Sequence, residues 1–404
     1  MLCFRVRNKF SLGAVLFLSS LIPAAQASKQ NSNPSRLQDA ARAMTEGQLH
    51  RAESDLQSVL RISPEDYRAL DLLGVVRVLQ RREVEAEQLF CRALQKTPDF
   101  APARAHLGLL YAQEGRPDEA IPQLREALRF DPARSDASAA LVRILQDQAR
   151  SAVAAGNSEK ALLSLMEARK YAPDNPDIQF ELGTVELGMS LLQDAVVAFQ
   201  RSLQLRENNP RALYDLGRAF MGLAQFEEAR QQFDHYVQVR PDDATGYCAL
   251  GMTLAALERA SEARKQFERS IALDPGQTES FFRLGLIELD AGNLDEAVRN
   301  LDLALARDSK HTGALSALGR VAFEQKRYPE AIDLLQRAIA IDDSSREAHY
   351  YLGLTFARLG RKDEADDQLQ IATRLEHNEA VRRRTVLRIL DGPSSGSLSS
   401  QPQK

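Results

Sequence analysis

The chain has 404 residues, no Trp, 6% aromatic residues, 27% charged residues and a formal net charge of −4. A single hydrophobic core rarely grows to this length, so several domains or a repeat array are expected. The scarcity of aromatics favours long amphipathic helices over a β-sandwich. A mildly acidic chain is a poor candidate for nucleic-acid binding, which depends on neutralising phosphates.

The first 27 residues have the three parts of a secretory signal peptide. Residues 5–9 hold three cations, residues 10–22 are apolar, and residues 25–27 read Ala-Gln-Ala, an A-x-A cleavage site. We therefore expect cleavage between Ala27 and Ser28, export to the periplasm or secretion, and a flexible segment over 28–35. An uncleaved membrane anchor is the alternative, but residues 10–22 fall short of the ~20 apolar residues that a spanning helix needs. No membrane span is expected after cleavage.

Beyond this segment the sequence repeats itself every 34 residues. A Leu-Gly pair recurs in two runs, and an Ala follows twelve residues after each Gly. Two weaker copies have Ala40 and Ala149 in place of the Gly. The glycines are Gly74, Gly108, Gly183, Gly217, Gly251, Gly285, Gly319 and Gly353. A fixed period of this length indicates an array of small structural units.

One copy shows the pattern closely: "APARAHLGLLYAQEGRPDEAIPQLREALRFDPAR", residues 101–134. It resembles the tetratricopeptide repeat at Leu107, Gly108, Tyr111, Gly115, Ala120, Leu124, Ala127 and Pro132. The resemblance covers residues 36–379 and implies an all-α fold, a right-handed superhelical solenoid of about ten helix-turn-helix repeats. The repeats start near residues 33, 67, 101, 142, 176, 210, 244, 278, 312 and 346.

The repeat spacing has a physical basis when positions are counted from the first residue of each repeat. Positions 4, 7, 8 and 11 form one stripe of an amphipathic helix. Small residues at positions 8 and 20 let the two helices of a pair approach closely. An excess of seven residues at 135–141 amounts to about two helical turns, so we expect a long helix that projects from the stack.

The C-terminal region contains one further helix signal. Residues 380–391 predict a capping helix with a solvated outer face, which the end of a solenoid requires. Its arginines leave a phosphate or lipid contact as an alternative. Residues 392–404 are rich in Ser and Gly and are expected to be disordered.

The sequence contains no catalytic constellation. Pairs such as Asp118-Glu119 and Glu227-Glu228 lie in the first turn of second helices, where the helix dipole favours acids. The six histidines are scattered singly, and "GPSSG" at 392–396 lacks the strand and helix that a nucleophile elbow needs. The sequence therefore predicts a protein that is not an enzyme, with no cofactor and no metal.

The binding surface is placed by the family resemblance. In the family, positions 2, 5, 9 and 12 of the first helices point into a concave groove. Here they combine aromatic, Met and Arg residues, the composition of protein-binding hot spots. The alternative is that these side chains pack only against neighbouring repeats. The predicted groove residues are Arg143, Arg150, Phe180, Arg211, Tyr214, Arg218, Met221, Met252, Phe282, Leu286, Leu289 and Arg320.

These features predict a non-enzymatic scaffold that binds a protein or peptide segment, apolar with acidic character, in cell-envelope assembly or export. Two alternatives stay open. One is a substrate-docking accessory subunit of a separately encoded transferase, and the other is a membrane-anchored structural scaffold.

Overall fold

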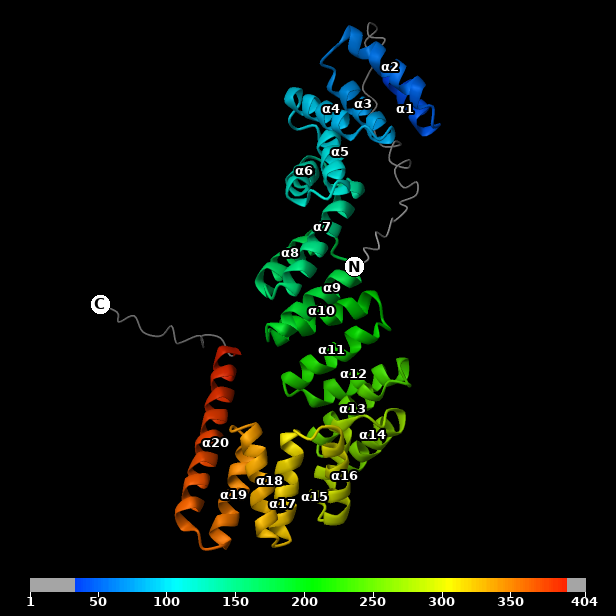
Figure 1. The fold of residues 1–404 in the computed structure, drawn as a ribbon. Coiled ribbons are helices and arrows are strands. Elements are labelled where there is room, and N and C mark those ends of the chain that lie inside the picture. The colour runs from blue at the N-terminus through cyan, green and yellow to red at the C-terminus, as the bar shows by residue number, and fades with distance from the viewer. Residues whose placement is uncertain (1–32, 391–404) are drawn as a thin grey trace, which may run out of the picture. The chain divides into compact units, whose positions relative to one another are not determined.

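The computed structural model describes residues 33–390, and within this range the regular structure is entirely helical. Consecutive helices pack as pairs, each pair corresponding to one repeat (Figure 1). The predicted all-α solenoid of helix-turn-helix repeats is therefore confirmed. The chain divides into two compact units, Met1–Glu207 and Asn208–Lys404.

The first unit holds five helix pairs. Most first helices have 13 residues and most second helices have 14. The pairs are α1 (Asn33–Thr45) with α2 (Leu49–Ile62), α3 (Tyr67–Leu79) with α4 (Glu83–Lys96), α5 (Ala101–Gln113) with α6 (Pro117–Phe130), α7 (Ser135–Ala154) with α8 (Ser158–Tyr171), and α9 (Pro176–Gly188) with α10 (Leu192–Leu205).

The second unit also holds five pairs. Its first helices all begin at the residues where the sequence starts a repeat. The pairs are α11 (Pro210–Gly222) with α12 (Phe226–Val239), α13 (Ala244–Ala256) with α14 (Ala260–Leu273), α15 (Thr278–Asp290) with α16 (Leu294–Arg307), α17 (Thr312–Glu324) with α18 (Tyr328–Ile341), and α19 (Arg346–Arg358) with α20 (Lys362–Leu390).

The core of each pair forms where a small residue of the first helix faces a large one of the second. The residue at position 24 packs onto position 8, so the ring of Phe267 lies directly over Gly251. Ala263, at position 20, is fully buried beside it. The small residues thus allow the close approach of the helices that the 34-residue pattern predicts.

The turn between the two helices of each pair contains a residue in the left-handed conformation. This is position 15, and its φ is positive in all ten repeats. Glycine occupies the position five times, whereas Arg81, Ser190, Ala224, Glu258 and Lys326 occupy it in the other repeats with φ between 57° and 62°. The left-handed region is unfavourable for residues with a Cβ, so these five turns carry backbone strain.

Replacing Ala224 with glycine should raise the free energy of unfolding by about 1 kcal/mol. The left-handed region costs an L-residue about 1–2 kcal/mol, and the greater freedom of glycine in the unfolded chain offsets part of the gain. Urea unfolding followed by far-UV circular dichroism measures the change. The matched control is Gly292→Ala, where a Cβ meets no atom within 4 Å and φ is 80°; it should destabilise by a similar amount. An unchanged midpoint for Ala224→Gly would contradict the strain.

The seven-residue insertion lengthens α7, but it does not project. Helix α7 has 20 residues, as the sequence predicts, yet Ala137 and Leu141 are fully buried and Ala140 nearly so. These residues join the core cluster that contains Leu107 of α5. The expected projection is therefore wrong, because the added turns carry small and apolar residues that bury against the preceding pair.

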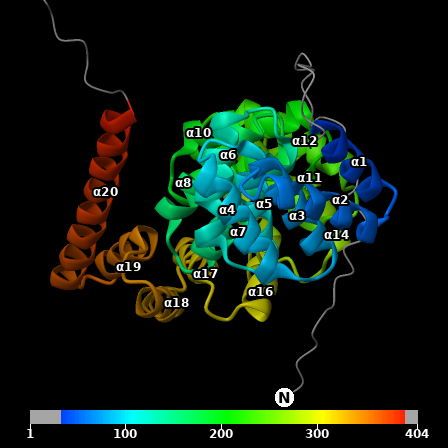
Figure 2. The same ribbon diagram turned by 90° about the horizontal axis from the view of Figure 1, so that it is seen from above.

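The two ends of the helical array also differ from expectation. Residues 33–35, expected to be flexible, form the first turn of α1. Residues 380–390, expected to form a separate capping helix, continue α20, which has 29 residues and extends beyond α19 (Figures 1 and 2). The sequence between 362 and 390 contains no Gly or Pro that would end the helix. The predicted signal peptide and the tail at 392–404 lie outside the described residues.

Candidate functional site

The predicted groove residues fall into both units, and most of them lie in the second. Arg143, Arg150 and Phe180 belong to the first unit, on α7 and α9. The remaining nine lie on first helices of the second unit, from α11 to α17.

Helix α11 divides by face. It starts at Pro210, and the side chain of Asn209 caps it by accepting a hydrogen bond from the backbone N–H of Arg211 at 3.2 Å. The apolar side chains at positions 4, 7 and 11 are buried. On the other face, Arg211 and Arg218 are exposed, and Tyr214 and Met221 are half-buried. This second face is accessible for binding.

The ring of Tyr214 is held by the second helix of its own pair. Its centroid lies 5.5 Å from that of Phe233 and 5.3 Å from that of Tyr236, both on α12. Burial raises the pKa of the Tyr214 phenol, so the group stays neutral. Tyr236 is fixed in turn, because its hydroxyl donates to Asp243 at 2.5 Å. Tyr214 is thus a positioned aromatic with part of its surface free.

Two methionines follow Tyr214 along the same face. The sulfur of Met221 lies 3.3 Å from the hydroxyl of Thr253 on α13. Met252, which directly precedes Thr253 on α13, is half-buried. Methionine is flexible and polarisable, so the pair offers an adaptable apolar surface.

Phe282 on α15 is packed from two sides. Its ring centroid lies 4.6 Å from that of His311. Its edge also rests on Gly313, where a Cβ would lie 2.7 Å from the ring. His311 accepts a hydrogen bond at Nδ1 from the backbone N–H of Ala314 at 3.1 Å, so its proton is on Nε2. Phe282 is therefore held in place by its neighbours.

A charged group supports this cluster. The Nε2 atom of His311 lies 3.6 Å from a carboxylate oxygen of Glu279, and Arg283 donates to the other oxygen at 2.6 Å. The interaction with His311 is the largest cause of the lowered pKa of Glu279. The sequence did not predict a role for His311 or Tyr236, because both lie outside the four groove positions.

Most of the predicted arginines are already paired. Arg218 contacts Asp215 at 3.0 Å, and Arg320 contacts Asp290 at 3.1 Å. In the first unit, Arg150 contacts Glu181 at 2.7 Å. Within the described residues, the exposed side chains of Arg143 and Arg211 form no ion pair. The unpaired positive charge of the predicted set is thus confined to one arginine in each unit.

One predicted groove residue is wrong. Leu289 is 2% exposed and belongs to the core cluster shared with Leu301 of α16 and Leu318 of α17. It lies in the last turn of α15, where position 12 turns toward the next repeat. Leu286 is half-buried at the edge of the same cluster and retains part of its surface. Phe180 in the first unit is likewise half-buried, with its ring 5.9 Å from Phe199.

The described residues contain no group of three or more His, Cys, Asp or Glu side chains suited to a metal ion. The carboxylate pairs act locally: Glu119 contacts Arg116, and Glu227 contacts Arg230, each at 2.6 Å. Burial raises the pKa of the thiols of Cys91 and Cys248. Among the helices of residues 33–390, none is long and apolar enough to cross a membrane.

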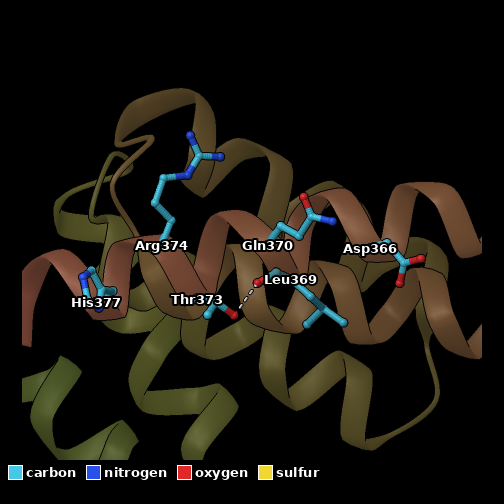
Figure 3. Close-up of a pocket in the computed structure, with 6 residues that line it drawn as sticks. All are labelled: Asp366, Leu369, Gln370, Thr373, Arg374 and His377. Atoms are coloured by element: carbon cyan, nitrogen blue, oxygen red, sulfur yellow. Dashed lines mark hydrogen bonds between the residues drawn. The ribbon is translucent and has the colours of Figure 1, made fainter.

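A shallow pocket runs along α20 (Figure 3). It is lined by Asp366, Leu369, Gln370, Thr373, Arg374 and His377. In the preceding pair, Leu335 and Ile339 of α18 hold the positions of Leu369 and Thr373, and they pack with residues of α19. The pocket therefore lies on the face that a following first helix covers in earlier repeats, and five of its six lining residues are polar or charged.

Family models for the tetratricopeptide repeat match most of the described chain. One model matches residues 37–102, 147–210 and 282–346, and three others match 186–251, 101–134 with 244–277, and 347–374. The chain is a tetratricopeptide repeat protein.

A solved structure shows the same fold. A tetratricopeptide repeat protein from Parabacteroides merdae is 16% identical, with a TM-score of 0.52, and the match covers 60% of this chain and 96% of that one. MamA from Desulfovibrio magneticus is 20% identical, with a TM-score of 0.41, and the match covers 42% and 97% of the two chains.

One sequence relative is a probable glycosyltransferase. The tetratricopeptide repeat protein is 28% identical over 133 residues to a probable UDP-N-acetylglucosamine–peptide N-acetylglucosaminyltransferase, SPINDLY, from Hordeum vulgare. The match covers 32% of this chain and 14% of the enzyme's length. It thus spans a small part of the enzyme.

Proposed function

We propose that this tetratricopeptide repeat protein is a non-enzymatic scaffold that binds a protein segment on the second unit. Arg211, Tyr214, Met221, Met252 and Phe282 form the proposed binding face. The observation that carries the proposal is the fixing of Tyr214 and Phe282 by neighbouring rings while part of each stays exposed. Rigid aromatics lose little entropy on binding and are common at hot spots.

The chemistry of the binding face favours a mainly apolar segment. Arg211 offers its unpaired charge to one acidic group of the partner. The remaining cations, such as Arg218, are neutralised by nearby acids. A highly acidic partner therefore gains little, and apolar side chains that contact Tyr214, Met252 and Phe282 supply most of the affinity.

Selection from a displayed library of short random peptides tests the binding face. The immobilised full chain should enrich peptides rich in apolar residues, and Tyr214→Glu/Phe282→Glu should no longer retain them. The control is Leu303→Glu, on α16, where the leucine is 42% exposed; it should retain the peptides. Equal retention by both variants would contradict the proposal.

We also propose that the scaffold acts outside the cytoplasm. The predicted signal peptide supports export to the periplasm or secretion, with a role in envelope assembly or export. The mass of the native N-terminus tests this: a chain that begins at Ser28 supports export with cleavage, whereas a chain that retains residues 1–27 supports the membrane-anchored scaffold.

The SPINDLY match favours a second candidate, an accessory subunit that docks protein substrates for a separate transferase. In that case, adding the chain to such a transferase should speed transfer to a protein acceptor and leave transfer to a short peptide acceptor unchanged. Equal effects on both acceptors would contradict docking.

A further inference from the structure

The outer surface of α8 carries two large exposed apolar side chains. Leu163 is 68% exposed and Met166 is 46% exposed. They occupy positions 22 and 25 of the fourth repeat. In no other repeat are both positions occupied by large apolar residues; the seventh repeat, for example, has Lys265 and Glu268 there. The exposure of this pair is therefore specific to one helix.

Opposite charges lie at the two ends of the same stripe. Glu159 is four residues before Leu163, and Lys170 is four residues after Met166. At 100° per residue, the four side chains fall within an arc of about 60° on the helix. Glu159 and Lys170 are exposed, and neither forms an ion pair within the described residues. The stripe thus has an acidic end, an apolar middle and a basic end.

This order is self-complementary. A two-fold axis midway between Leu163 and Met166 pairs Leu163 of one helix with Met166 of an antiparallel copy, and Glu159 with Lys170. A closed two-fold interface requires this reciprocity: if one residue of the first copy contacts a second residue of the other copy, the same two residues also meet with the copies exchanged. We propose that a second copy of this chain docks on α8 in the antiparallel direction through Glu159, Leu163, Met166 and Lys170.

The flanks of the stripe agree with this arrangement. Lys160 and Glu167 lie on one side, and the same axis brings Lys160 of one copy toward Glu167 of the other. Arg125 of α6 already holds Glu167 through two hydrogen bonds, at 2.6 Å and 2.5 Å. On α10, the corresponding stripe holds the 61% exposed Val197 among uncharged glutamines. The flank formed by Lys160 and Glu167 therefore brings opposite charges of the two copies together.

The size of the interface indicates a weak dimer. Helix α8 has 14 residues and is about 21 Å long. One pair of such helices buries less than the roughly 1,200–2,000 Å² of a stable complex. Association should therefore depend on concentration in the micromolar to millimolar range.

Sedimentation velocity of the full chain tests the dimer. The wild type should show a sedimentation coefficient that rises with concentration up to about 1 mM, the weak end of specific association. Leu163→Glu/Met166→Glu should remain a monomer with an unchanged circular dichroism spectrum. These side chains are exposed, so the variant folds. A wild type that stays monomeric, or a dimer that survives this variant, would overturn the proposal.

A charge swap tests the antiparallel direction. Glu159→Lys alone and Lys170→Glu alone should each weaken the dimer about tenfold, because two contacts per dimer become like-charged. The double variant Glu159→Lys/Lys170→Glu should restore the wild-type dissociation constant. A double variant as weak as the single ones would show that these residues do not face each other.

Discussion

Replacing Gly251 with alanine is expected to lower the free energy of unfolding by about 1–3 kcal/mol, the range for overpacking a close-packed core. A Cβ at this position would lie 2.7 Å from the ring of Phe267. Phe267 is fully buried. The added methyl group therefore forces the two helices of the pair apart. Urea unfolding of the full chain measures the loss.

The repeats themselves supply the compensating change. The two repeats with alanine at position 8, Ala40 and Ala149, have Leu56 and Leu165 at position 24 and never phenylalanine. Phe267→Leu should restore part of the stability lost in Gly251→Ala, although alone it leaves a cavity and destabilises. Purely additive losses in the double variant would show that the ring does not cause the destabilisation.

Glu186→Leu is expected to stabilise the protein by about 1–3 kcal/mol, the cost of leaving a buried polar group unsatisfied. Glu186 is 8% exposed, and one of its carboxylate oxygens accepts no hydrogen bond within the described residues. It holds position 11. At the same position in earlier repeats, Arg77 donates a hydrogen bond to Glu53 and Tyr111 donates one to Glu87, each at 2.8 Å. Both acceptors hold position 21 of the preceding repeat. The corresponding residue for Glu186 is Leu162, which offers no hydrogen bond.

The matched control is Glu288→Leu, at the same position in another repeat. Glu288 is 3% exposed but pairs with Arg264 and accepts a hydrogen bond from Asn293 at 2.8 Å. Removing it leaves both donors without their acceptor, so this variant should destabilise. If Glu186→Leu and Glu288→Leu changed the free energy of unfolding in urea in the same direction, the proposed difference between the two glutamates would be contradicted.

The gain from Glu186→Leu should also depend on pH. Burial, followed by repulsion from Asp194, raises the pKa of Glu186 above 4.5, and Arg169 opposes the shift. A raised pKa in the folded state means that the carboxylate form destabilises the fold. The stabilisation by Glu186→Leu should thus be full at neutral pH. It should shrink as the pH falls through the pKa of Glu186 in the folded protein toward 4.5. A gain independent of pH would contradict the role of the charge.

The 34-residue period predicted the helix pairs because it reports burial directly. Leu216, Gly217 and Phe220 recur at fixed spacing, and they are buried in α11 as that spacing requires. The seven added residues predicted the length of α7 for the same reason. Whether those turns project depends on contacts with the preceding pair, which periodicity does not contain.

The candidate site was less predictable because position alone does not set exposure or pairing. Leu286 and Leu289 both hold groove positions, yet only Leu289 is in the core. Arg218 and Arg211 look alike in sequence, but Asp215 is one helical turn from Arg218 and pairs with it. The left-handed residues other than glycine, such as Ala224, gave no sequence signal because their side chains are typical of helices.

Site-specific photo-cross-linking tests the binding face most directly. A photoreactive phenylalanine derivative replaces Met252 or, as a control, Leu303 of α16, and the full chain is irradiated with a peptide from the library selection. Cross-linking is expected from position 252 and not from position 303. Cross-linking from position 303, or from neither position while the peptide still binds, would contradict the assignment of the binding face.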